Sequence, residues 1–289
     1  MKYKNIYERI LTSAKSRLGL DLPIVSRTVL DRPVKVRIDT IADKPDMDDG
    51  WLYALITECS VFYDVGSNIG EASLWACLDD PYRRVVVMEA NSRALAVAQK
   101  NFDLNGFSTR VRCVLAFISD TEDEDVAFFA EGVKQASSRY SSHTSSFKNS
   151  KSTIKVKTTT LDRVARETGF VPDLIKIDVE GAEAEALAGA REVARQHQPR
   201  FIVEMHSMPE LSMRENGEKV LAWCQELGYD CYYLKTHEQV TSPDGFAERK
   251  RCHLYLQPAG QPYPAYLKEI GQGSMLDEAR AIMRRHNSR

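Results

Sequence analysis

Short apolar runs that alternate with helical segments constrain the fold of this chain most strongly. Apolar runs typical of strands occur at 61–65, 85–88, 174–179 and 201–205. Helical patterns separate them at 71–78, 92–104 and 181–196. Strands without polar alternation are buried on both faces of a parallel sheet, and parallel strands need crossover helices. The sequence therefore predicts an α/β fold with a doubly wound, mostly parallel seven-stranded sheet.

The remaining segments are weaker but fit the same plan. Further strands are expected at 110–118, 126–129, 153–159, 229–234 and 253–256, and further helices at 161–168, 217–227 and 274–285. The short connection 235–252 favours an antiparallel hairpin at one edge of the sheet. The chain then divides into an N-terminal helix and irregular segment (1–58), a central domain (59–260) and a C-terminal helical extension (261–289).

Charge and cysteine content narrow the class of protein. The 39 Lys and Arg residues balance 41 Asp and Glu residues, so no basic footprint for nucleic acid is present. The six cysteines form no C-x-x-C pair, and no apolar run is long enough to span a membrane. A cytoplasmic location is the expectation. Residues 2–18 predict a basic amphipathic helix, which either packs on the domain or contacts an anionic membrane surface. The sequence does not indicate an oligomeric state.

The first strand ends in a glycine turn that carries an acid. The segment Asp64-Val-Gly-Ser-Asn-Ile-Gly70 has glycines at positions 66 and 70 and Asn68 where a second glycine often occurs. Asn tolerates left-handed backbone better than most residues. The turn lacks the G-x-G-x-x-G pattern that admits a pyrophosphate. It suits a cationic ligand without phosphate, such as S-adenosylmethionine (SAM), although a tight turn without ligand is the simpler alternative.

Two later strand ends extend this predicted cofactor site. Ligands of open parallel sheets bind beyond the carboxyl ends of the strands. Glu89 ends the next strand, where a carboxylate can accept hydrogen bonds from both ribose hydroxyls. Ala116, in the third strand end, is expected to flank the adenine.

A charged cluster follows at the next two strand ends. Lys176 and Asp178 alternate with apolar residues in one strand, and a charged pair in a buried strand is costly unless it is paired or used. Glu204 and His206 leave the neighbouring strand at the same end. We expect His206 or Asp178 to act as a general base, with Lys176 positioning the carboxylates.

Together these motifs resemble the FkbM family of methyltransferases. The resemblance rests on D-V-G-S-N-I-G at 64–70, Glu89-Ala-Asn91, T-L-D at 160–162 and I-K-I-D-V-E-G-A-E at 175–183. It implies a Rossmann-like class I fold and transfer of a methyl group from SAM to a hydroxyl of a sugar, glycan or natural product. The cofactor residues expected are Asp64, Gly66, Ser67, Asn68, Gly70, Glu89, Ala90, Asn91 and Ala116. The reaction-site residues implied are Lys176, Asp178, Glu180, Glu183, Glu204 and His206.

Several alternatives stay open at this point. Asp178 and Glu204 occupy positions of magnesium ligands in catechol-type enzymes, but Gly181 stands where those have a lysine, so Mg²⁺ is not favoured. A nicotinamide-dependent oxidoreductase shares the strand–turn–helix plan, and a non-catalytic scaffold would share the whole fold. His143, in the serine-rich segment 134–150, is a further candidate for substrate contact.

Overall fold

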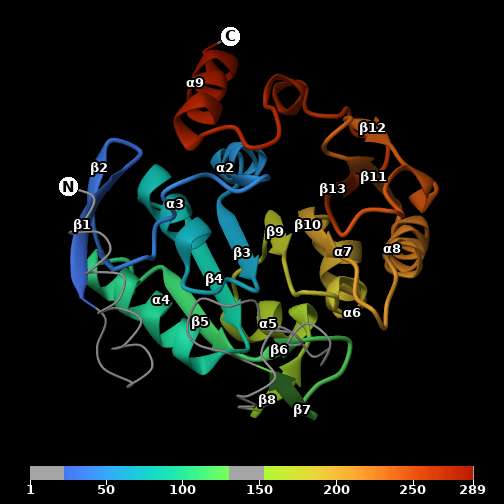
Figure 1. The fold of residues 1–289 in the computed structure, drawn as a ribbon, viewed down its shortest axis with the longest axis horizontal. Coiled ribbons are helices and arrows are strands. Elements are labelled where there is room, and N and C mark those ends of the chain that lie inside the picture. Colours follow the sequence, from blue (N-terminus) through green and yellow to red (C-terminus); the bar gives the residue numbers. More distant parts are fainter. Residues whose placement is uncertain (1–22, 130–152, 289) are drawn as a thin grey trace.

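The computed structural model describes residues 23–129 and 153–288, which build one large sheet with helices on both faces (Figure 1). The strand order of the sheet is β12-β11-β13-β10-β9-β3-β4-β5. Its strands are β3 (Val61–Val65), β4 (Arg84–Glu89), β5 (Val111–Leu115), β9 (Leu174–Ile177), β10 (Arg200–His206), β11 (Tyr229–Tyr233), β12 (Glu238–Gln239) and β13 (Arg251–Pro258). The predicted basic helix 2–18, the segment 134–150 and His143 lie outside the described residues.

The five strands β5, β4, β3, β9 and β10 are parallel, as predicted. Strand β13 is antiparallel to both of its neighbours and lies between β10 and β11. The expected antiparallel pair is therefore present, but the last strand enters the sheet instead of forming its edge. The short strand β12 makes the sheet eight-stranded, where the sequence predicted seven.

Helices cover the two faces of the sheet separately, which gives two hydrophobic cores. One core is built under α2 (Asp49–Thr57), α3 (Glu71–Asp79), α4 (Ser92–Leu104) and α9 (Leu276–Asn287). The other lies under α5 (Leu161–Thr168), α6 (Glu183–Ala188), α7 (Arg191–His197) and α8 (Met213–Leu227). Two 3₁₀ turns, η2 (Pro243–Gly245) and η3 (Ala265–Glu269), complete the described helical segments. The arrangement is the doubly wound α/β fold that the sequence predicted.

Helix α2 is the main element that sequence reasoning missed. Its residues from Gly50 to Ile56 are all buried, so the helix has no polar face and no 3.6-residue period. It packs against α9, which lies above it in Figure 1, and both contribute to one core with the sheet. The domain boundaries predicted at residues 58 and 260 stay predictions.

The helix predicted at 181–196 was wrong in its continuity, because the chain forms α6 and α7 with a break between them. Gly189 packs its backbone against Ser119, so closely that an added Cβ would lie 2.1 Å from the Ser119 carbonyl oxygen. The Gly189 carbonyl accepts a hydrogen bond from the amide of Asp162 in place of a helical one. Helix α8 begins four residues before the prediction, at a capping box of Ser212 and Glu215.

Two small sheets lie beside the main one. The hairpin of β1 (Ile24–Val29) and β2 (Arg32–Arg37) rests on α4, where the side-chain oxygen of Asn101 accepts the amide of Arg37 at 2.8 Å. The strand predicted at 110–118 ends at Leu115, and after Ala116 the chain enters a second sheet. That sheet has the order β6 (Phe117–Ile118), β8 (Thr153–Thr159) and β7 (Asp125–Phe129).

Candidate active site

The glycine turn after β3 has the backbone geometry that its sequence indicated. Gly66, Asn68 and Gly70 all have positive φ, at 74°, 52° and 82°. A Cβ on Gly66 would lie 1.8 Å from the carbonyl oxygen of Asp178 at the end of β9, so any side chain would push the two strand ends apart. The turn is therefore packed directly against the segment that carries the predicted reaction site.

Glu89 fixes the turn from the neighbouring strand. One of its carboxylate oxygens accepts the amide of Asn68 and the other accepts the amide of Asn91, each at 2.8 Å. Burial raises the pKa of Glu89 even though these amide hydrogen bonds favour the charged form. Asn91 in turn caps α4 by accepting the amides of Arg93 and Ala94. Each oxygen of Glu89 keeps a second lone pair with which to accept a ligand hydroxyl.

A first pocket lies between this turn and the ends of β4 and β5. Predicted cofactor residues lining it are Gly66, Asn68, Glu89, Ala90, Asn91 and Ala116. Asp178 and Glu180 close one side. Sequence reasoning missed the apolar walls Met88, Phe117, Ile118 and Val179, because strand-end apolar residues look the same whether they face a ligand or a core.

The other predicted cofactor residues lie elsewhere. The buried carboxylate of Asp64 accepts the Ser73 hydroxyl at 2.6 Å, and Asp64 and Ser67 line a second pocket on the other side of the turn. Gly70 lines neither pocket. A Cβ there would lie 2.9 Å from the Phe102 ring, so this glycine lets α3 pack against α4. For Gly70, close packing and the left-handed backbone explain the residue type without a ligand contact.

The second pocket holds the charged cluster. Lys176 and Glu204 line it together with acids at the start of α2, and it shares Gly66, Asn68 and Asp178 with the first pocket. Its walls come from three parallel strands and from the loop before α2, which the sequence had not connected to the site. The two pockets therefore meet at the glycine turn and at Asp178.

Lys176 and Asp178 form an ion pair in this second pocket, with 3.0 Å between Nζ and Oδ2. Lys176 neighbours Asp64 across the β3–β9 ladder. Burial by itself lowers the pKa of Lys176, but Asp178 and Asp64 outweigh it and raise the pKa above its usual value. Burial raises the pKa of Asp178 to about 7, since Lys176 only partly offsets it and Glu204 adds to it. The lysine is therefore cationic at neutral pH, while Asp178 is half-ionised.

The imidazole of His206 is surrounded by three carboxylates. Its Nδ1 is 2.8 Å from Glu183, and its Nε2 is 3.4 Å from Glu180 and 3.5 Å from Glu204. Burial lowers the pKa of an imidazole, but these acids overcome it and raise the pKa of His206 to about 11. His206 lines neither pocket described above. It is a buried imidazolium at neutral pH.

Glu183 holds His206 from behind. Its side chain is fully buried and accepts hydrogen bonds from the Gly181 amide at 2.8 Å and from Asn216 at 2.7 Å. The sequence placed Glu183 and Glu180 at the substrate. The structure puts Glu180 on the wall of the first pocket and Glu183 behind His206.

Strand order, the glycine turn and the strand-end glutamate define the class of the protein as a Rossmann-like α/β fold of the class I methyltransferase type. The particular family follows from the sequence, because a family model for the methyltransferase FkbM domain matches residues 64–231, more than half of the chain. The chain belongs to this family, as its motifs predicted. Among curated proteins, none matches the sequence.

Solved structures with a similar chain trace include other methyltransferases. Methyltransferase FkbM from Methylobacillus flagellatus KT is 16% identical with a TM-score of 0.45, and the match covers 68% of this chain but 43% of that one. A putative caffeoyl-CoA O-methyltransferase from Staphylococcus aureus is 13% identical, with a TM-score of 0.44 and coverages of 89% and 94%. An O-methyltransferase from Bacillus cereus in complex with SAH is 11% identical, with a TM-score of 0.45 and coverages of 77% and 84%.

This chain thus spans less than half the length of the FkbM structure. Among the residues that the structure describes, no helix has both the length and the apolar character to cross a membrane. The cytoplasmic location predicted from the sequence stays a prediction.

Proposed function

We propose that this protein is a SAM-dependent O-methyltransferase that uses Asp178 as its general base. The observation that carries the proposal is the meeting of two pockets at Gly66, Asn68 and Asp178. A methyl donor in the first pocket and an acceptor in the second would face each other across these residues. Transfer requires that alignment, since in-line displacement depends on the position of both reactants.

The residues of the first pocket fit SAM. Glu89 offers lone pairs to ribose hydroxyls, and Ala116, Phe117 and Ile118 provide an apolar slot for a base. Two buried oxygens at the turn, Oδ1 of Asn68 and Oγ of Ser67, have no hydrogen-bond partner among the residues that the structure describes. Such acceptors suit the ammonium of an amino acid group. Bound there, SAM supplies an activated methyl group on a sulfonium.

Electrostatics favour Asp178 over His206 as the base. A general base must hold a free lone pair at the working pH, and an imidazolium with a pKa of about 11 does not. Asp178 is 25% exposed, lines both pockets and has a pKa of about 7, so its carboxylate can accept a proton near neutral pH. Lys176 holds that carboxylate from one side and leaves its other oxygen to the acceptor.

The proposed acceptor is a hydroxyl of a sugar, glycan or natural product. Carboxylates crowd the second pocket and accept hydrogen bonds from hydroxyl groups. A hydroxyl is a weak nucleophile until a base removes its proton, and Asp178 meets that need. This is the acceptor class that the resemblance to the FkbM family implied from the sequence.

A direct test compares Asp178→Asn with wild type. SAM affinity by calorimetry and methylation of a panel of sugars, glycans and hydroxylated natural products, read by product mass, would both be measured. We expect Asp178→Asn to bind SAM normally and to lose about 100-fold or more in kcat, the usual contribution of a general base. Asp125→Asn is a matched control, because it breaks an exposed Lys–Asp pair of the same 3.0 Å length.

Any of three results would contradict the proposal. Near-wild-type kcat in Asp178→Asn would exclude this residue as the base. Binding of NAD with no affinity for SAM would favour the nicotinamide-dependent oxidoreductase. SAM binding without transfer to any acceptor of the panel would favour a non-catalytic scaffold.

A further inference from the structure

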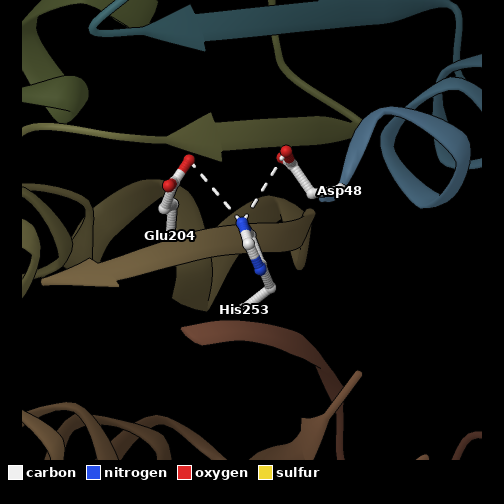
Figure 2. Close-up of side chains that lie close together, drawn as sticks. All are labelled: Asp48, Glu204 and His253. Atoms are coloured by element: carbon white, nitrogen blue, oxygen red, sulfur yellow. Dashed lines mark ion pairs between the residues drawn. The ribbon is translucent and has the colours of Figure 1, made fainter. Parts of the chain in front are cut away.

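Three buried side chains from separate segments form a group of possible metal ligands, and two of them line the second pocket. Asp48 precedes α2, Glu204 is in β10 and His253 is in β13 (Figure 2). Their ligand atoms all lie within 4.8 Å of one another. Glu204 and His253 are direct partners in the antiparallel ladder, so the sheet itself sets them side by side. Asp48 and His253 fall outside residues 64–231 that match the family model.

Asp48 and His253 both lack the hydrogen bond that a polar side chain at their position normally makes. Asp48 is the N-cap residue of α2, yet its side chain caps no amide of the helix. Within residues 23–129 and 153–288, the Nε2 atom of His253 has no hydrogen-bond partner, although the residue is only 2% exposed. A buried polar atom without a partner costs free energy, so such an atom calls for a ligand that the protein alone does not supply.

The separations between the facing atoms are ion-pair distances, which are too long for direct hydrogen bonds and close to the distances between ligands of one ion. Nε2 of His253 lies 3.6 Å from Oε2 of Glu204 and 3.7 Å from Oδ1 of Asp48. Hydrogen bonds between such atoms measure about 2.7–3.2 Å. Metal bonds of about 2.0–2.2 Å place neighbouring ligand atoms roughly 3–3.6 Å apart. The dashed lines of Figure 2 converge on this one nitrogen from both acids.

Neighbouring cations leave the facing oxygens available. Arg251 contacts Oε1 of Glu204 at 3.0 Å, and His206 approaches the same oxygen, so Oε2 is the atom directed at His253. Arg251 is held in turn by Asp46 at 2.8 Å. Lys176 pairs with Asp178 instead of Glu204. The two carboxylates therefore keep one oxygen each for an ion, which can enter from the second pocket that Asp48 and Glu204 line.

We infer that Asp48, Glu204 and His253 bind a divalent transition-metal ion. One imidazole and two carboxylates form a mixed nitrogen and oxygen set that suits Mn²⁺, Fe²⁺ or Zn²⁺, whereas Mg²⁺ prefers oxygen alone. This site differs from the Asp178–Glu204 magnesium pair considered from the sequence. The inference goes beyond methyl transfer and can be tested without SAM or an acceptor.

The probe is Mn²⁺, which binds carboxylate and imidazole and avoids the six cysteines of the chain. Metal-stripped full chain would be titrated with Mn²⁺ and followed by the loss of its free-ion electron paramagnetic resonance signal. We expect one bound ion per chain in the wild type, with affinity lowered at least 10-fold in Asp48→Asn and in His253→Gln. His197→Gln, at an exposed histidine, is the matched control and should bind like the wild type.

A second group, Asp178, Glu204 and His206, lies close enough to compete for an ion. Loss of binding in Asp178→Asn or His206→Gln, with Asp48→Asn and His253→Gln unaffected, would place the ion there and overturn the inference. No Mn²⁺ binding by the wild type at millimolar concentration would also overturn it. Asp48→Asn keeps the shape of the side chain, and its circular dichroism and melting curve show whether lost binding reflects lost folding.

Discussion

Substitution of Gly66 by alanine tests whether the glycine turn and the end of β9 at Asp178 depend on their close packing. The added Cβ would lie 1.8 Å from the Asp178 carbonyl oxygen, and contacts below 3.0 Å are essentially never found. The turn and the end of β9 must therefore separate by at least 1.2 Å. Because the hydrogen bond from Asn68 to Glu89 lies in the same turn, the first pocket should lose its shape together with the position of Asp178.

Both the free energy of unfolding and the kcat/KM of Gly66→Ala should fall. The left-handed backbone costs alanine roughly 1–2 kcal/mol, and overpacking costs about 1–3 kcal/mol more, so unfolding should become about 2–5 kcal/mol easier. A displacement of about 1 Å at a reaction centre lowers the rate by about 100-fold, which sets the expected loss in kcat/KM. Urea unfolding gives the first quantity, and methyl transfer with SAM gives the second.

Gly106→Ala separates the cost of the left-handed backbone from the cost of overpacking. Gly106 has φ of 73°, almost the value of Gly66, but no atom of the described part of the chain would lie within 4 Å of its added Cβ. This variant should lose only the roughly 1–2 kcal/mol of the backbone and keep its activity. If Gly66→Ala were as stable and as active as Gly106→Ala, the contact between the turn and Asp178 would not matter, and our account of the joined pockets would be refuted.

Two further predictions concern the ionisable residues of the site. Asp178 has a pKa near 7 and can accept a proton only when it is ionised. We therefore expect kcat to rise as pH increases through about 7 and to level off above it. If the pH profile of Asp178→Asn kept this step, the step would belong to another group. Glu89→Gln replaces one of two amide-accepting oxygens with a donor, and hydrogen bonds to a charged acceptor contribute about 1.5–3 kcal/mol. We expect SAM affinity by calorimetry to fall roughly 10- to 100-fold; unchanged affinity would show that Glu89 only braces the turn.

The sequence predicted the parts of the fold whose patterns are local. The left-handed Asn68, the strand-end Glu89 and the parallel strands around β3 follow from turn chemistry and from apolar runs. Helix α2 escaped prediction because it is buried all round, and periodicity appears only where one face meets water. The break at Gly189 depends on contact with Ser119, which lies 70 residues away in the chain.

The candidate site was predictable only where its residues follow a motif. Lys176, Asp178 and Glu204 stand at strand ends, and the topology does bring them together. Asp48 is placed near Glu204 by the buried helix α2, and His253 is placed there by the antiparallel strand β13. No local sequence pattern marks either residue. Likewise, the charge state of His206 depends on Glu180 just before α6, on Glu183 at the start of α6 and on Glu204 in β10, so the sequence alone did not distinguish it from Asp178 as the base.

The position of β13 between β10 and β11 also sets an order for folding. During synthesis β11 leaves the ribosome before β13, but β13 is the strand that joins it to the rest of the sheet. Until residue 258 has emerged, β10 has an unpaired edge and β11 is paired only with the two-residue strand β12. The growing chain therefore carries an open, aggregation-prone strand edge for the time needed to make about 50 residues, and a chaperone that binds extended apolar segments would act in that interval.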